Sequence, residues 1–183
     1  ALTLTEQECT SIMWPLLKNF LPKAGINRNI KRDVLYGPTK MQGLQLRNLY
    51  VWQGVSHVID IIEHKWKNTI TGSFITTELE LLRLELGLNG HIFTKNYTTY
   101  DKALLTHSWV QHTWEFTSKY GVSLQDNTRE IPLRRVHDIE IMTLVYKSKM
   151  EKKYWASINR CRMYLQVFSM ADITTGNRRQ VRE

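Results

Sequence analysis

The chain has 183 residues, 42% of them hydrophobic, six tryptophans and a formal net charge of +8 at pH 7. This length supports one substantial core, or a small domain with an extension. No apolar run approaches the roughly 20 residues that cross a bilayer, and no secretory signal opens the chain. We therefore expect an intracellular protein, nuclear or cytoplasmic, without a membrane partner. Its excess of positive charge favours nucleic acid as the partner. Cys9 and Cys161 stand far apart, and both are expected to be free thiols.

The first predicted element is a helix that begins at a capping box. The Thr5 hydroxyl can accept from the amide of Glu8, whose carboxylate can reach back to the Thr5 amide. Pro15 falls inside the apolar repeat that follows and is expected to kink or split the helix, because proline removes a backbone donor. Pro22 and Gly25 are expected to end it.

A basic segment and a long helix are predicted next. The basic segment contains a short helix over residues 29–36 with Asn29 as its cap, and Gly37-Pro38 then turns the chain. Over residues 49–66 apolar side chains recur at spacings of three and four, which predicts a long helix with one buried face. The residues expected on that buried face are Trp52, Val55, Ile59 and Ile62.

The rest of the chain predicts further helices. One over residues 71–87 is apolar around much of its circumference and ends at Gly87, and another over 101–120 ends at Gly121. Two more are expected over residues 137–146 and 151–166. Residues 90–99 suggest a loop or a small hairpin. The predicted fold is therefore all-α, an irregular bundle of about seven helices with short loops.

Sequence patterns typical of catalysis are absent. The chain lacks the Asp-Asp pair of a polymerase site, a phosphate-binding GxxxxGK loop and a GxSxG elbow. His57 and His64 have no evident third ligand, so no metal site and no cofactor are expected. Asp138, beside His137, falls in the first turn of a predicted helix, where the helix dipole by itself favours an acidic residue. A hydrolase that uses His57 or His137-Asp138 is the weakest alternative.

The basic residues are clustered rather than interspersed with acids. Asp33 is the only acid between Lys18 and Arg47, and Glu151 is the only one between Lys147 and Arg162. Such clusters favour contacts with phosphates and little base specificity. The candidate nucleic-acid-binding residues are Arg28, Lys31, Arg32, Lys40, Arg47, Lys149, Lys152, Lys153 and Arg160. The tyrosines beside cations or loops, which are candidates for stacking on bases or sugars, are Tyr36, Tyr50 and Tyr100.

Several motifs occur in a characteristic order. They are Arg32-x-Val34-x-Tyr36-Gly37-Pro38, Gly43-Leu44, Asn48-Leu49-Tyr50, Gln53-Gly54, His57, Ile158-Asn159-Arg160-Cys161-Arg162, Tyr164-Leu165-Gln166 and Ala171-Asp172-Ile173. This order resembles the segment just downstream of the polymerase core in reverse-transcriptase-like proteins of protist non-LTR retroelements. The resemblance implies a thumb-like helical domain over residues 1–70 and a helical extension packed on it over 71–173. The polar and basic composition of residues 174–183 predicts a flexible tail.

The same resemblance implies a function. The fragment itself would not be catalytic, and its parent would be an RNA-directed DNA polymerase. Its partners would be nucleic acid (RNA, DNA or hybrid) and the upstream polymerase domain, with the fragment clamping the template–primer duplex or element RNA. The alternative function is a helical protein–protein interaction module whose basic clusters serve only solubility.

Overall fold

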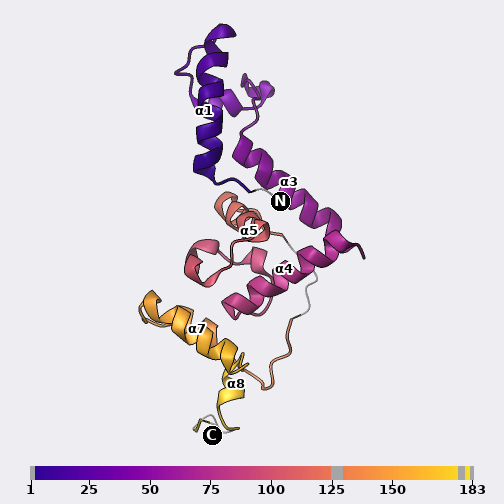
Figure 1. Ribbon diagram of the computed structural model, residues 1–183, viewed down its shortest axis with the longest axis vertical. Coiled ribbons are helices and arrows are strands. Elements are labelled where there is room, and N and C mark those ends of the chain that lie inside the picture. The colour runs from indigo at the N-terminus through magenta and orange to yellow at the C-terminus, as the bar shows by residue number, and fades with distance from the viewer. Residues whose placement is uncertain (1–2, 125–129, 177–179, 182–183) are drawn as a thin grey trace. The chain divides into compact units, whose positions relative to one another are not determined.

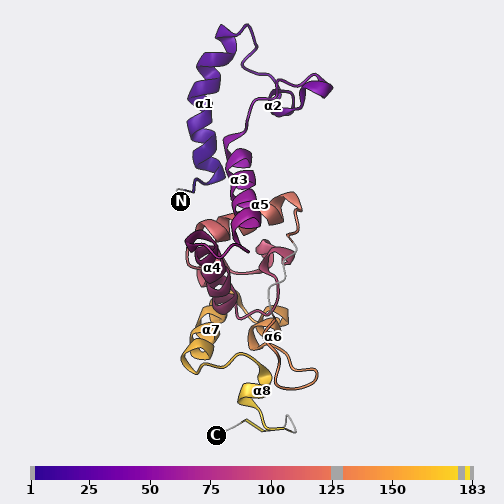
Figure 2. The same ribbon diagram turned by 90° about the vertical axis from the view of Figure 1, so that its right-hand side faces the viewer.

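The computed structural model describes residues 3–124, 130–176 and 180–181. The fold is all-α, as predicted: the protein is 61% helical, with eight α-helices and no strand among the described residues. The chain divides into two compact units, unit 1 (Ala1–Glu63) and unit 2 (His64–Glu183) (Figure 1 and Figure 2). None of the described helices combines the length and the apolar character that a bilayer crossing requires.

Unit 1 begins with the predicted capping box. Helix α1 (Glu6–Lys23) starts where the Glu8 amide donates to Thr5 Oγ1 at 3.2 Å and the Thr5 amide donates to Glu8 Oε2 at 2.7 Å. The helix is not split at Pro15, because it continues through that residue to Lys23. Losing one backbone hydrogen bond is thus tolerated within a helix of 18 residues.

Helix α2 (Arg32–Tyr36) begins later than predicted. Lys31 rather than Asn29 is its N-cap. The reason is a turn in the preceding loop, where Asn27 Oδ1 accepts from the Asn29 amide at 2.9 Å. Asparagine side chains favour such turns and thereby compete with helix formation.

The loop after α2 folds back onto it and explains two glycines of the motif. The Leu44 amide donates to Val34 O at 2.9 Å, and the Leu46 amide donates to Leu35 O at 3.0 Å. The 3₁₀ helix η1 (Thr39–Met41) lies in the loop that these two bonds close. A Cβ atom at Gly43 would lie 2.1 Å from Gly37 O. No larger residue fits at Gly43 without moving the backbone, so this part of the motif has a structural role.

The core of unit 1 lies between α1 and α2. Its buried members are Leu17, Leu21 and Leu35, and the partly buried side chains packed around them are Met13, Ile26, Ile30, Tyr36 and Leu46. The core therefore packs the apolar side of α1 against the basic segment. This packing holds the loops that carry the cations in place.

Helix α3 (Leu49–His64) buries a different face from the one predicted. Gly54, His57 and Ile61 are buried. The prediction that α3 buries a face at Trp52, Val55, Ile59 and Ile62 is wrong, because these side chains are 43% to 59% exposed. Apolar residues surround most of this helix, so spacings of three and four predict a helix without deciding which side meets the core.

Unit 2 contains five further α-helices and four short 3₁₀ helices. They are α4 (Ile70–Leu86), η2 (Ile92–Thr94), η3 (Tyr97–Thr99), η4 (Lys102–Leu104), α5 (Trp109–Tyr120), α6 (Ile141–Lys147), η5 (Lys152–Tyr154), α7 (Trp155–Tyr164) and α8 (Met170–Ile173). Residues 90–99 thus form two 3₁₀ turns and not a hairpin. The helix predicted from residue 101 begins only at Trp109, where Ser108 Oγ accepts from the Gln111 amide at 3.2 Å.

The C-terminus of α4 is the main junction of unit 2. Gly87 ends the helix at a φ of 62°, as predicted. Three side chains then satisfy its last carbonyls. Tyr146 Oη donates to Leu86 O at 2.8 Å, Asn159 Nδ2 donates to Glu85 O at 2.6 Å, and Arg162 Nη2 donates to Leu84 O. The last carbonyls of a helix lack the amide four residues on, although Leu84 O also accepts from the Gly87 amide at 3.1 Å. Side chains of α6 and α7 therefore hold this end of α4 in place.

The two cysteines are free thiols, as predicted, and differ in exposure. Cys9 is buried in α1 and Cys161 is exposed on α7. Burial raises the pKa of the Cys9 thiol, and the neighbouring Glu8 carboxylate raises it further. Less thiolate is therefore available at Cys9, and reagents reach it less readily.

We expect one thiol of the native, unreduced protein to react rapidly with a disulfide reagent and the second to react only on unfolding. The Cys161→Ser variant should lose the rapid phase, and the Cys9→Ser variant should keep it. Stopped-flow absorbance of the released thiolate measures both phases. A denatured, unreduced sample with no reactive thiol would contradict this prediction.

Candidate nucleic-acid interface

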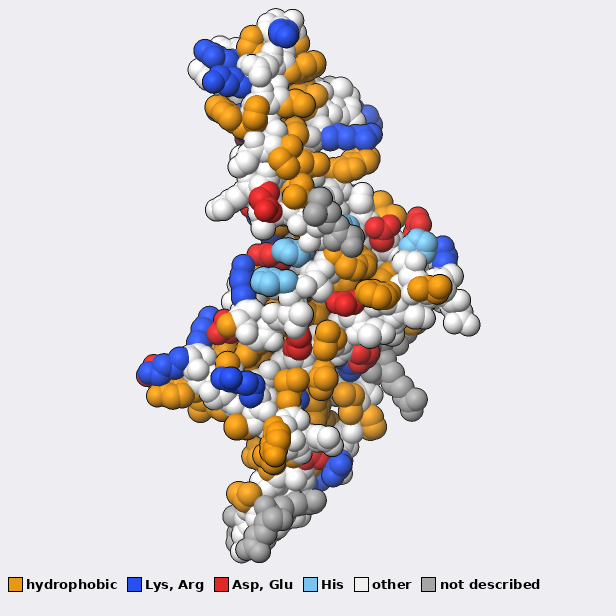
Figure 3. Space-filling model, viewed as in Figure 1, with side chains coloured by type: hydrophobic (Ala, Val, Ile, Leu, Met, Phe, Trp, Pro, Cys, Tyr) orange, Lys and Arg blue, Asp and Glu red, His pale blue; other side chains and the backbone are white. Residues whose placement is uncertain are grey.

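Four of the candidate cations in unit 1 are exposed and form no ion pair with a described residue. They are Arg28 and Lys31 in the turn between α1 and α2, Lys40 in η1, and Arg47 before α3. Within the part of the chain that the structure describes, no carboxylate forms an ion pair with any of them. On unit 1, basic side chains lie among exposed hydrophobic ones (Figure 3). These four positive charges are available to an anionic partner.

A groove of about 580 Å³ lies beside these cations, and we call it the unit 1 groove. Its lining comes from the end of α2, from η1 and the following loop, and from the first two turns of α3. The lining residues used below are Tyr36, Gln45, Arg47, Val51, Trp52 and Val55. The groove therefore combines a cation with aromatic and aliphatic walls.

Arg47 and Trp52 form a stacked pair in this groove. The guanidinium carbon of Arg47 lies 3.8 Å from the centroid of the Trp52 ring. Asn48, between them in sequence, stabilises the start of α3, because its Oδ1 accepts from the amides of Tyr50 at 3.0 Å and Val51 at 3.3 Å. A guanidinium stacked on an indole ring is held in a defined orientation while it keeps its charge.

Arg32 differs from the other candidates. It is half-buried, its guanidinium carbon lies 5.7 Å from the centroid of the Trp14 ring, and its Nη1 is buried without a hydrogen-bond partner among the described residues. Tyr36 lines the unit 1 groove as well as the hollow that holds Arg32. Arg32 thus packs against α1, and the expectation that it faces the nucleic acid stays a prediction.

The two aromatic residues that line the unit 1 groove are Tyr36 and Trp52, whereas Tyr50 lies outside its lining. Trp52 was not predicted as a site residue, because the apolar periodicity of α3 places it on the expected core face. No local signal indicated this pair, since Arg47 and Trp52 are five residues apart and side chains of a helix meet at spacings of three and four.

The candidate cations of unit 2 are all exposed, and one of them is paired. They are Lys149, Lys152, Lys153 and Arg160. Lys153 Nζ lies 2.6 Å from Glu151 Oε2, so part of its charge is neutralised. Surface pairs of this kind contribute little to stability and exchange readily for other partners.

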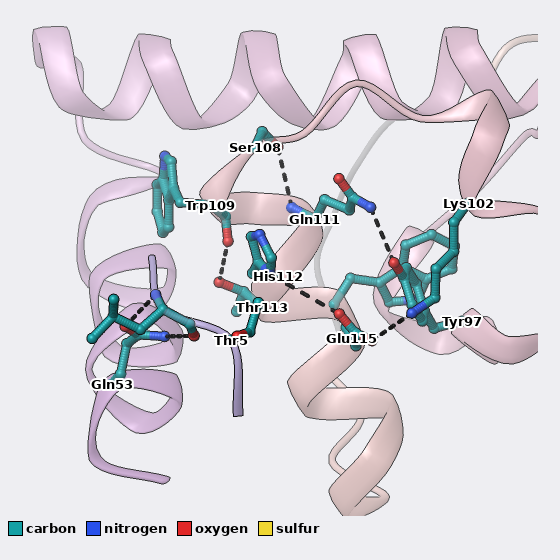
Figure 4. A network of polar contacts seen from close by, with 12 residues as sticks. Thr5, Gln53, Tyr97, Lys102, Ser108, Trp109, Gln111, His112, Thr113 and Glu115 are labelled. Carbon is teal, nitrogen blue, oxygen red and sulfur yellow. Dashed lines mark hydrogen bonds and ion pairs between the residues drawn. The ribbon is translucent and has the colours of Figure 1, made fainter. Parts of the chain in front are cut away.

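Lys152 lies near two lysines that are distant from it in sequence. With Lys102 and Lys119 it lines a hollow of about 540 Å³, which we call the unit 2 hollow. Lys102 Nζ lies 2.9 Å from Glu115 Oε1 and 5.2 Å from the centroid of the Tyr97 ring (Figure 4). The hydrogen bond to Glu115 raises the pKa of the Lys102 amine. Lys102 and Lys119 were not predicted as site residues, because neither belongs to a basic run.

Three arginines of unit 2 are structural. Arg162, counted in the second basic cluster, is 3% exposed and donates to Asn159 Oδ1 at 2.8 Å as well as to α4. Burial lowers the pKa of its guanidinium. Arg83 is buried and pairs with Glu80 at 2.8 Å, and Arg135 donates to carbonyls around the end of α8. These three arginines bind acceptors within unit 2 and are therefore set apart from the candidate binding residues.

Tyr100 belongs to an aromatic cluster. Its ring centroid lies 4.9 Å from that of Tyr146 and 5.6 Å from that of Trp114. Burial raises the pKa of the Tyr100 hydroxyl. The Tyr100 ring thus packs against other aromatic rings of unit 2. These contacts explain its position without any stacking on bases.

The described histidines and acids include the sequence's candidate metal ligands and catalytic groups, His57 and Asp138 among them. Among residues 3–124, 130–176 and 180–181, no three His, Cys, Asp or Glu side chains are arranged to hold a metal ion. His57 is buried in α3. Asp138 Oδ1 accepts from the amides of Ile139 at 3.1 Å and Ala171 at 3.0 Å, so this carboxylate holds the start of α8 against the preceding loop.

The chain was also compared with known proteins. No family model, no curated protein and no solved structure matches it. The arrangement of its own residues therefore carries the argument for its function.

Proposed function

We propose that this chain binds nucleic acid through the phosphate backbone and has no catalytic centre of its own. The observation that carries the proposal is the set of exposed cations in unit 1, Arg28, Lys31, Lys40 and Arg47, which pair with none of the described carboxylates. Such cations can replace the counterions of phosphates, and the release of those counterions drives binding. The core of Leu17, Leu21 and Leu35 supports this role by holding the loops in place.

The resemblance described above supplies the setting of this proposal. The chain would be the thumb and helical extension of a retroelement reverse transcriptase, and it would clamp template–primer duplex or element RNA beside the polymerase domain of its parent. The exposed lysines around the unit 2 hollow support a second contact with the same strand.

A protein-interaction module is the second candidate function. The specific observation behind it is the exposed apolar surface on α1 and α3. Its members are Ile12, Trp14, Leu16 and Phe20 on α1 and Trp52, Val55, Ile59 and Ile62 on α3. Exposed apolar patches often mark surfaces that other proteins cover.

The triple variant Arg28→Gln, Lys31→Gln, Lys40→Gln tests the main proposal. Each phosphate contact contributes about 0.9 to the slope of log affinity against log salt concentration, so this variant should flatten the slope by about two to three units. Fluorescence anisotropy with a labelled RNA–DNA hybrid at several salt concentrations measures it. Arg32 is left unchanged because it packs on Trp14.

A triple variant in unit 2 with the same loss of charge is the matched comparison. Lys149→Gln, Lys152→Gln, Lys153→Gln should flatten the slope only if the second cluster contacts the same strand. If the unit 1 variant keeps the affinity and slope of the unchanged protein, the proposal is wrong, and the interaction module becomes the better function.

A further inference from the structure

The unit 1 groove is lined in part by aromatic and aliphatic side chains, which contacts with phosphates do not require. A backbone-binding surface needs exposed cations, whereas this groove adds Tyr36, Val51, Trp52 and Val55. In a duplex the faces of the bases are covered by their neighbours in the stack. Only an unpaired base can lay its face against aromatic and aliphatic walls.

The stacked pair is already in place for such a base. Arg47 lies over Trp52 at 3.8 Å, yet both side chains remain exposed, Trp52 with 49% of its surface. Proteins that bind single strands stack bases on aromatic rings and on guanidinium planes. Because Arg47 and Trp52 are ordered against each other before binding, less conformational entropy is lost when a base joins them.

The size and polar groups of the groove fit one nucleotide. Its volume of about 580 Å³ falls within the range of about 300–1,000 Å³ typical of small-molecule sites. Gln45 lines the groove, and its Oε1 accepts from Thr39 Oγ1 at 3.4 Å, which leaves its amide N–H groups as donors for a base edge. Lys40 directly follows Thr39 in η1 and supplies a charge for the adjoining phosphate.

We infer that the unit 1 groove receives one unpaired nucleotide base, stacked on the Arg47–Trp52 pair, so that the chain prefers single-stranded nucleic acid to a blunt duplex. This inference rests on the proposed function and specifies its substrate. A strand end or a junction, where a paired region gives way to an unpaired one, would engage the groove and the surrounding cations together.

The test uses a short single strand that carries one 2-aminopurine, and the same strand in a blunt duplex, at one salt concentration. The unchanged protein should bind the single strand about tenfold more tightly and quench the 2-aminopurine on stacking. Trp52→Ala should remove this preference and the quenching. It should lower duplex affinity less than single-strand affinity, and because Arg47 keeps its charge the salt slope should fall by less than about one unit.

Two variants control for folding and for the loss of an aromatic ring. Trp66→Ala removes a tryptophan that is 60% exposed and lies outside the groove lining, and it should leave the preference intact. Trp52→Phe keeps a ring for stacking and should restore part of the preference. Circular dichroism of each variant confirms its helix content.

The outcomes separate the inference from the proposed function. Equal affinity for both probes, with a salt slope that still falls in the unit 1 triple variant, would overturn the inference and leave backbone binding standing. Equal effects of Trp52→Ala and Trp66→Ala would also overturn it. Binding of neither probe would overturn the inference and the proposed function together.

Discussion

Replacing Arg162 with Met should lower the free energy of unfolding of unit 2 by about 2–5 kcal/mol. The guanidinium is 3% exposed and donates to Leu84 O and to Asn159 Oδ1. Methionine fills much of the same space but donates nothing, so buried Asn159 Oδ1 loses the donors from Arg162 and Leu84 O keeps the Gly87 amide at 3.1 Å. Water cannot easily take its place, because Gly87 lies so close that a Cβ there would be 3.0 Å from Arg162 Cζ.

Arg160→Met is the matched control for this prediction. Arg160 lies on the same helix and is exposed, so its replacement should change the free energy of unfolding by no more than about 0.5 kcal/mol. Urea denaturation followed by circular dichroism measures both variants. If the Arg162 variant unfolds at the same urea concentration as the Arg160 variant, the junction at the end of α4 does not stabilise unit 2 as described.

Replacing Leu35 with Ala should cost about 2–5 kcal/mol of the stability of unit 1. Leu35 is fully buried between α1 and α2 and packs with Leu17 and Leu21. Truncation of this side chain removes apolar burial and leaves a cavity, and the backbone bond from the Leu46 amide to Leu35 O restricts how far the loop can close it.

Ile59→Ala is the informative comparison for Leu35→Ala. The periodicity of α3 predicts a buried Ile59 and a comparable loss, whereas the side chain is 46% exposed in the structure. We therefore expect Ile59→Ala to cost less than about 1 kcal/mol. Thermal and urea unfolding of both variants decide between the two assignments. A larger loss for Ile59→Ala than for Leu35→Ala would mean that a partner or another part of the protein covers this face of α3.

The local features of this fold could be predicted from the sequence. The capping box of Thr5 and Glu8 and the helix ends at Gly87 and Gly121 occur where expected. Each depends on residues within one turn of one another, or on a backbone conformation that glycine adopts at low cost. The all-α class follows from the same short-range repeats, because a spacing of three and four residues is a property of the helix itself.

The candidate site could be predicted only in part. The exposed cations of unit 1 belong to one continuous basic segment, so a scan of charge along the chain finds them. The pairing of Arg47 with Trp52 was not predicted, since apolar periodicity had assigned Trp52 to the core. The gathering of Lys102, Lys119 and Lys152 around one hollow also depends on how distant segments pack.

The sequence by itself determined which segments form helices, where several of them begin and end, and where positive charge is concentrated. The tertiary structure alone decided which side of α3 is buried and which cations remain on the surface. Arg160 and Arg162 illustrate the difference, because they are two residues apart and alike in a charge scan. Arg160 is exposed on α7, whereas Arg162 is buried and donates to Leu84 O at the end of α4. The position of that helix end depends on contacts between residues 78 positions apart, which no local pattern records.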